Sequence, residues 1–229
     1  ITAHLATFNS IVDDVARVRR LFGLDGRPPL DLFLADPDLG PLVRRQPGLR
    51  IPGSWNRFET AVRILLGQQI SVAAATTLTG RIVERHGKAF DVGSPDLSRA
   101  FPSAATLAEA SFDNIGMPGA RIEMIRRFAA AVEEGRVDLY GSGALDEITG
   151  ELEELPGIGP WTSQLIALRV LRHHDAFPAS DLGLRISVGR LIGEDRPPGA
   201  KVAAYAERWR PYRALAAHYL WATLHDEEL

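Results

Sequence analysis

Leu155-Pro156-Gly157-Ile158-Gly159-Pro160-Trp161-Thr162 is the stretch of this 229-residue chain that decides its fold. Segments of helix-forming composition, 144–152 and 161–171, flank it, so the stretch predicts a hairpin between two helices. Glycine permits positive φ and close approach of another backbone, and proline suits the first turn of a helix. We therefore expect free backbone amides at a positive helix end, which favours phosphate binding. These amides belong to Gly157, Gly159, Trp161 and Thr162.

A single carboxylate, Asp181, follows the hairpin after about one helix length. Together with a phosphate-binding hairpin, it indicates chemistry on a nucleic-acid strand. A carboxylate can stabilise a developing positive charge or orient a water molecule. The alternative is an ordinary helix-capping aspartate. We expect Ser180 to cap the helix, which leaves the Asp181 side chain for catalysis.

The composition excludes several classes of protein. The chain has no cysteine, so it forms no disulfide and holds no cysteine-ligated zinc or iron–sulfur cluster. No apolar run approaches the ~18 residues of a membrane span. The net charge is −3, and only two of the 26 basic residues are lysine. We expect a modest basic face near the hairpin and Asp181, made by Arg169, Arg172, Arg185 and Arg190.

Helical patterns follow one another along the chain, which predicts an all-α fold. A loop rich in Pro, Gly and Asp at 23–53 is expected to contain short helical turns near 31–33 and 39–43. Ser71 is expected to cap a long helix that stops at Gly87. Residues 1–7 alternate like a strand, and they are either such a strand or an irregular terminus. The expected helices cover 11–22, 58–66, 71–86, 103–110, 120–134, 144–152, 161–171, 181–191, 200–209 and 211–224.

The hairpin and Asp181 together resemble the helix-hairpin-helix-GPD superfamily of DNA glycosylases. Trp161, Asp181 and the run 206–213, Ala-Glu-Arg-Trp-Arg-Pro-Tyr-Arg, resemble its DNA-3-methyladenine glycosylase II branch. The resemblance is collinear from Phe8 to Leu224. It implies a two-lobed helical fold, with a central lobe at 52–175 that contains the helix-hairpin-helix, 144–171. A discontinuous lobe, 8–51 plus 176–229, then carries Asp181 and Trp221, and 1–7 is a possible strand of an absent β domain.

The resemblance also implies roles for individual residues. Trp161 and Trp221 line the base pocket, where indole rings suit a cationic alkylated purine. Leu165 stands where relatives often carry tyrosine. Gln69 is implied as the wedge that fills the space left by a flipped nucleotide, with Gln68 beside it in contact with DNA. Each of these residues has a plainer alternative in core packing or helix capping.

Trp161 bears on the mechanism, because related enzymes that also cleave the strand place a Schiff-base lysine there. The resemblance therefore implies hydrolysis alone, by a monofunctional glycosylase for 3-methyladenine-type purines that leaves an abasic site. No cofactor is required. A structural Na⁺ or K⁺ ion is implied at the hairpin, on the backbone carbonyls of Glu153, Leu155 and Gly157.

The implied partner is duplex DNA with damaged bases. We expect a monomer in the bacterial cytoplasm, associated with the nucleoid, with no membrane contact. The chain begins at Ile1 without methionine, so we expect a piece of a longer repair protein. Two alternatives stay open: a non-catalytic helix-hairpin-helix DNA-binding module, and a glycosylase for another base lesion.

Overall fold

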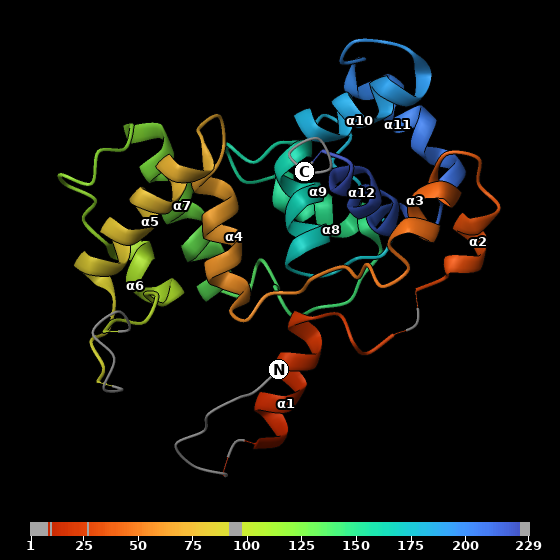
Figure 1. Cartoon of the computed structure of the whole chain (residues 1–229). Coiled ribbons are helices and arrows are strands. Elements are labelled where there is room, and N and C mark those ends of the chain that lie inside the picture. Colours follow the sequence, from red (N-terminus) through yellow and green to blue (C-terminus); the bar gives the residue numbers. More distant parts are fainter. Residues whose placement is uncertain (1–8, 10, 27, 92–97, 225–229) are drawn as a thin grey trace. The chain divides into compact units, whose positions relative to one another are not determined.

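A computed structural model describes residues 9, 11–26, 28–91 and 98–224 (Figure 1). This part of the chain is mostly helical, and its β pairing is one isolated antiparallel bridge between Ala89 and Arg99. The prediction of an all-α fold is confirmed. The strand expected at 1–7 lies outside the described residues. No helix in the described part has the length and apolar character that crossing a membrane requires.

The chain divides into two compact units. Unit 1 is formed by residues 1–55 and 172–229, and unit 2 by residues 56–171. The sequence predicted boundaries at 51/52 and 175/176, a few residues from these positions. Unit 2 carries the hairpin, whereas unit 1 carries Asp181 and Trp221.

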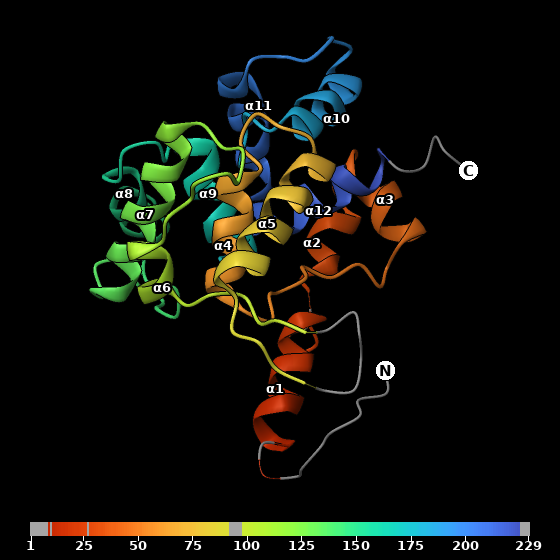
Figure 2. The same cartoon turned by 90° about the vertical axis from the view of Figure 1, so that its left-hand side faces the viewer.

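Unit 2 contains six helices among its described residues, and their capping follows local sequence signals. Asn56 caps α4 by accepting the Glu59 amide at 3.0 Å, and Ser71 caps α5 by accepting the Ala74 amide at 3.2 Å, as predicted for Ser71. Figure 2 shows α7 and α9 next to α4. The helices are α4 (Arg57–Leu66), α5 (Val72–His86), α6 (Ala104–Glu109), α7 (Gly119–Glu133), α8 (Leu145–Glu153) and α9 (Pro160–Arg169).

Gly87 ends α5, but it does not have the left-handed conformation that often makes glycine the residue after a helix. Its φ is −69°, which any residue adopts. A Cβ there would lie 2.4 Å from the Val83 carbonyl oxygen and 2.5 Å from that of Ala100. The position therefore requires glycine because two backbones approach it closely.

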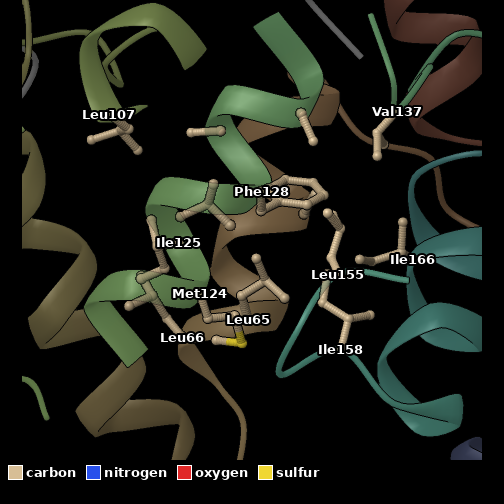
Figure 3. Close-up of a cluster of buried hydrophobic side chains, with 14 of the residues drawn as sticks. Leu65, Leu66, Leu107, Met124, Ile125, Phe128, Val137, Leu155, Ile158 and Ile166 are labelled. Atoms are coloured by element: carbon tan, nitrogen blue, oxygen red, sulfur yellow. The ribbon is translucent and has the colours of Figure 1, made fainter. Parts of the chain in front are cut away.

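The hairpin is fixed to the core of unit 2 by its own apolar residues. Leu155 and Ile158 are buried and point into the cluster around Phe128 and Leu65 (Figure 3). Burying a side chain of this kind contributes roughly 1.5–3 kcal/mol. The residues between and after them are thereby held at the surface, in a turn whose position the core determines.

Unit 1 combines the N-terminal helices with the last helices of the chain. Within it, α12 packs against α3 and α10, and α10 also packs against α11. The elements are α1 (Ile11–Leu21), α2 (Leu30–Leu34), α3 (Leu39–Arg45), α10 (Leu182–Ile192), α11 (Gly199–Ala206), the 3₁₀ helix Glu207–Trp209 and α12 (Arg213–Ala222).

A buried ion pair joins the segment before α10 to the start of α12. The Arg213 guanidinium donates to both carboxylate oxygens of Asp175, each at 2.8 Å. The Ala214 amide also donates to the His174 carbonyl at 3.0 Å. These contacts hold the approach to Asp181 against the helix that carries Trp221.

Candidate nucleic-acid interface and active site

The hairpin of unit 2 has one residue in the left-handed region. Gly157 has a φ of +95°, and a Cβ there would lie 3.0 Å from the Met124 sulfur. Its amide and that of Gly159 make no hydrogen bond within the described residues. Pro160 begins α9, as the sequence predicted. Two amides at a helix N-terminus form the kind of site that binds a phosphate group.

One expectation about the hairpin was wrong, and Gly159 does not use the positive φ that glycine permits. The Thr162 amide is not free, because it donates to the Gly159 carbonyl at 2.9 Å. Gly159 is not strained, because its φ of −108° and ψ of −179° are extended. A Cβ on Gly159 would meet no atom within 4 Å. Glycine at this position therefore leaves open space in front of the helix end.

The loop at Gln68 is bonded to the hairpin. The Gln68 side-chain amide donates to the Thr162 hydroxyl at 2.9 Å and to the Gly157 carbonyl at 3.2 Å. The Gln68 carbonyl accepts from Arg121 Nη2 at 2.7 Å. Gln68 was expected to contact DNA beside the wedge, but its side chain is directed to the hairpin, where it joins two predicted DNA-contacting loops into one surface.

Gln69 is exposed and has a φ of +57°, an uncommon conformation for a residue other than glycine. The residues on either side fix this turn, because Gln68 is bonded to the hairpin and Ser71 caps α5. Left-handed residues of this kind cluster at functional sites. The geometry is suited to the wedge role that the resemblance implies, which stays a prediction.

Asp181 lies in unit 1 at the N-cap of α10. Its Oδ1 accepts the Leu184 amide at 3.1 Å and the indole Nε1–H of Trp221 at 2.8 Å. The expectation that Ser180 caps this helix was wrong, because the backbone conformation places Asp181 at the cap position. A helix N-terminus stabilises the negative charge of the carboxylate.

Gly183 permits this arrangement, and its role was not predicted from the sequence. A Cβ on Gly183 would lie 3.0 Å from Trp221 Cδ1, 3.1 Å from Asp181 Oδ1 and 2.9 Å from Leu224 Cδ1. Glycine costs roughly 1 kcal/mol relative to alanine inside a helix, so its presence in the first turn was the available signal. The missing side chain lets α12 approach the start of α10.

Unit 1 contains a second carboxylate–indole pair that provides an internal comparison. Asp36 Oδ1 accepts the Leu39 amide at 2.9 Å, and its Oδ2 accepts from Trp209 Nε1 at 3.1 Å. The difference lies in the indole: Trp209 is 2% exposed, whereas Trp221 is partly exposed. A carboxylate bonded both to a backbone amide at a helix start and to tryptophan is therefore a packing feature in one place and an accessible site in the other.

Residues 62–211, well over half of the chain, match the family model for the HhH-GPD superfamily base excision DNA repair protein. The chain belongs to the HhH-GPD superfamily. Residues 1–56 also match the model of the AlkA N-terminal domain. The hairpin and Asp181 both lie within the HhH-GPD match.

Curated relatives place this HhH-GPD protein beside alkylation-repair enzymes. It is 39% identical to the probable bifunctional transcriptional activator/DNA repair enzyme AlkA of Mycobacterium tuberculosis, over 96% of this chain and 44% of that protein. It is 34% identical to DNA-3-methyladenine glycosylase 2 of Escherichia coli, over 91% of this chain and 71% of that protein. The chain thus spans less than half the length of the mycobacterial relative.

A solved structure supports the same placement of this HhH-GPD protein. The 3-methyladenine DNA-glycosylase from Archaeoglobus fulgidus superposes with a TM-score of 0.80 at 25% identity. The superposition covers 99% of this chain and 78% of the archaeal one. The helical fold of this chain is therefore similar to that of the archaeal protein.

The remaining predicted site residues of this HhH-GPD protein fall in unit 2. Trp161 and Leu165 lie on the first turns of α9 and are partly exposed, and their role in a base pocket stays a prediction. Two of the carbonyls proposed for a monovalent cation already accept one hydrogen bond: Leu155 from the Ile158 amide and Gly157 from Gln68. A carbonyl has two lone pairs, so these bonds are compatible with an ion.

Proposed function

We propose that this chain is a DNA glycosylase that hydrolyses the N-glycosidic bond of alkylated purines in duplex DNA. The observation that carries the proposal is Asp181, a partly exposed carboxylate at a helix N-terminus that accepts the indole N–H of Trp221 at 2.8 Å. Membership in a base excision repair family and the names of the E. coli and A. fulgidus relatives support it.

The Asp181 carboxylate supplies the charge that this reaction requires. As the base departs, positive charge develops on the deoxyribose, and a fixed negative group close to it lowers the barrier. The hydrogen bonds from Leu184 and Trp221 to Oδ1 hold the carboxylate in one orientation. The same carboxylate orients the water that adds to the sugar.

The hairpin and the Gln69 turn bind and open the DNA. The amides of Gly157 and Gly159 bind a phosphate, and Gln69 occupies the position that the flipped nucleotide leaves. Since Gln68 bonds the turn to the hairpin, both contacts are held in a fixed relation within unit 2. A Na⁺ or K⁺ ion on the hairpin carbonyls would add positive potential toward the phosphate.

The enzyme acts by hydrolysis without strand cleavage. A lyase forms a Schiff base through an amine, and the hairpin position that carries lysine in such relatives is Trp161 here. The sequence contains two lysines, Lys88 and Lys201. Lys201 forms an ion pair with Glu194, and Lys88 lies in the bridge after α5. Borohydride should trap no covalent adduct with lesion DNA, and a stoichiometric adduct would identify a lyase.

The deciding experiment is single-turnover release of defined bases from duplexes that each carry one lesion. Asp181→Asn keeps the shape but removes the charge, and we expect release to fall by roughly two orders of magnitude, about 3 kcal/mol of transition-state stabilisation. The loss should be larger for neutral hypoxanthine than for cationic 3-methyladenine, which departs with less assistance. Asp36→Asn is the matched control, because Asp36 makes the same two kinds of contact beside a buried indole.

Three outcomes would change the proposal. Tight binding of the wild-type chain to DNA without release of any base would indicate the non-catalytic DNA-binding module. Release of an oxidised or deaminated base in preference to 3-methyladenine would indicate a glycosylase for another lesion. Equal activity of Asp181→Asn and wild type would make Asp181 a helix cap only.

A further inference from the structure

Unit 1 contains a cavity of about 190 Å³ that the proposed reaction does not use. Two arginines, Arg50 and Arg172, line it together with His174 and Tyr212, and Pro28 and Pro29 form part of an apolar wall. No aspartate or glutamate is among its described lining residues. The cavity therefore combines two permanent positive charges with an apolar side.

Arg172 reaches the cavity through space that two glycines leave. A Cβ on Gly23 would lie 3.5 Å from Arg172 Nη2, and a Cβ on Gly53 would lie 3.2 Å from Arg172 Cδ. Each would also lie 2.6 Å from a backbone carbonyl, so neither position accepts a side chain without rearrangement. Arg172 itself has a φ of +58°. The Arg172 side chain therefore runs beside two positions that have no side chain.

The charge of Arg172 is not balanced by its neighbours. Its Nε is buried and has no hydrogen-bond partner in the described structure. Asp25 and Asp175 are the carboxylates that lie next in sequence to residues lining the cavity. Each is paired with another arginine: Asp25 with Arg19 at 2.7 Å, and Asp175 with Arg213 at 2.8 Å. Buried polar atoms are almost always partnered, so an unpartnered Nε on this partly exposed arginine is unusual.

Arg50 adds a second guanidinium to the same cavity. Its one hydrogen bond in the described residues joins Nη1 to the Gly26 carbonyl at 3.4 Å, which is long and brings no opposite charge. Guanidinium groups bind phosphate oxygens in a two-pronged geometry, and two such groups can hold separate oxygens of one phosphate.

We propose that this cavity binds a phosphate group between Arg50 and Arg172, with the partly apolar wall facing the carbon side of a phosphate ester. The phosphate belongs either to a DNA strand or to a small phosphate ester. This inference does not rest on Asp181 or on the hairpin, so the glycosylase proposal can fail without affecting it.

The first arm of the test titrates inorganic phosphate into the full chain by isothermal titration calorimetry at constant ionic strength. We expect saturable binding that Arg172→Gln and Arg50→Gln each weaken tenfold or more. Arg44→Gln removes an exposed arginine of α3 that lies outside the cavity, and it should leave the affinity for phosphate unchanged. All titrations are repeated in a Gly159→Val background, which blocks the hairpin amides, so that the phosphate binding measured there comes from the cavity. If Arg172→Gln disturbs folding, seen by circular dichroism, Arg50→Gln decides.

The second arm measures the affinity for an undamaged duplex over a range of salt concentrations. If a DNA phosphate is the ligand, Arg172→Gln lowers the slope of log K against log salt by about 1. If a small phosphate ester is the ligand, Arg172→Gln binds the duplex with wild-type affinity, although it binds inorganic phosphate more weakly in the first arm. Absence of saturable phosphate binding, or equal binding by wild type and both arginine variants, would overturn the proposal.

Discussion

The indole Nε1 of Trp221 lies 2.8 Å from Oδ1 of Asp181, although 40 positions separate the two residues in the chain. The contact joins α12, which carries Trp221, to Asp181, the residue that immediately precedes α10. It gives Trp221 a role beyond an aromatic surface, because the N–H holds one oxygen of the candidate catalytic carboxylate. The same oxygen also accepts the amide that caps the helix.

Trp221→Phe tests this hydrogen bond, because it keeps an aromatic ring and removes the N–H donor. A hydrogen bond to a charged group contributes about 1.5–3 kcal/mol, so we expect base release to slow by roughly tenfold or more. Affinity for undamaged DNA should change little. Trp209→Phe is the control: it removes the donor to Asp36 and should lower the unfolding free energy without slowing release. Equal rates for Trp221→Phe and wild type would limit Trp221 to stacking.

Gly183→Ala tests the close approach of α12 to α10. Alanine normally stabilises a helix by roughly 0.5–1 kcal/mol over glycine. Here the added Cβ lies 3.1 Å or less from atoms of Asp181, Trp221 and Leu224. We expect slower base release from a folded protein, measured under single-turnover conditions. An unchanged rate with a raised melting temperature would mean that the side chains move aside without consequence.

Gln69→Ala tests the wedge. Opening a paired site costs a few kcal/mol, and a mismatched site costs less. We therefore expect release from a paired lesion to fall more than release from the same lesion in a mismatch. Gln68→Ala should slow base release from the paired lesion and from the mismatched lesion, because it breaks the bonds to Gly157 and Thr162 that join the loop to the hairpin. Equal losses on both substrates for Gln69→Ala would argue against insertion.

Gly159→Val tests phosphate binding at the hairpin. The extended backbone accepts valine, so the substitution blocks approach to the amides without straining the fold. Affinity for damaged and undamaged duplexes should fall alike, because phosphate contacts carry no sequence information. Gly150→Val on α8, where a Cβ also meets no atom within 4 Å, is the control. Unchanged affinity in a folded Gly159→Val protein would contradict the hairpin's role.

Tyr205 predicts a pH dependence of stability in unit 1. Burial, together with the hydrogen bond to Asp38, raises the pKa of the Tyr205 phenol to about 12. The folded state thus holds this proton more tightly, so the contribution is complete below the ordinary pKa of 10.0 and is lost as the pH rises toward 12. Urea unfolding should show Tyr205→Phe less stable than wild type at pH 8, by about 1 kcal/mol. The difference should shrink by pH 11, and a constant difference would show that the phenol keeps its ordinary pKa.

The helices and the hairpin were predictable from the sequence because their causes are local. Apolar spacing, Ser71 at a cap position and proline after two glycines all act within a few residues. The hairpin also carries its own anchors, Leu155 and Ile158, whose burial follows from their apolar character. The choice between Ser180 and Asp181 as the cap was not predictable, since both residue types cap helices well and the backbone angles decide.

The tertiary structure alone decided which distant residues meet. Asp181 reaches Trp221, and Asp36 reaches Trp209, through helix packing between segments far apart in the chain. The exposure of the indole beside each carboxylate distinguishes the two pairs. Gly183 and Gln68 likewise have roles that depend on what lies opposite them. The sequence by itself determined where the helices and the candidate carboxylate stand, whereas packing determined the hydrogen bonds that orient that carboxylate, because such bonds require atoms within about 3 Å whatever their distance along the chain.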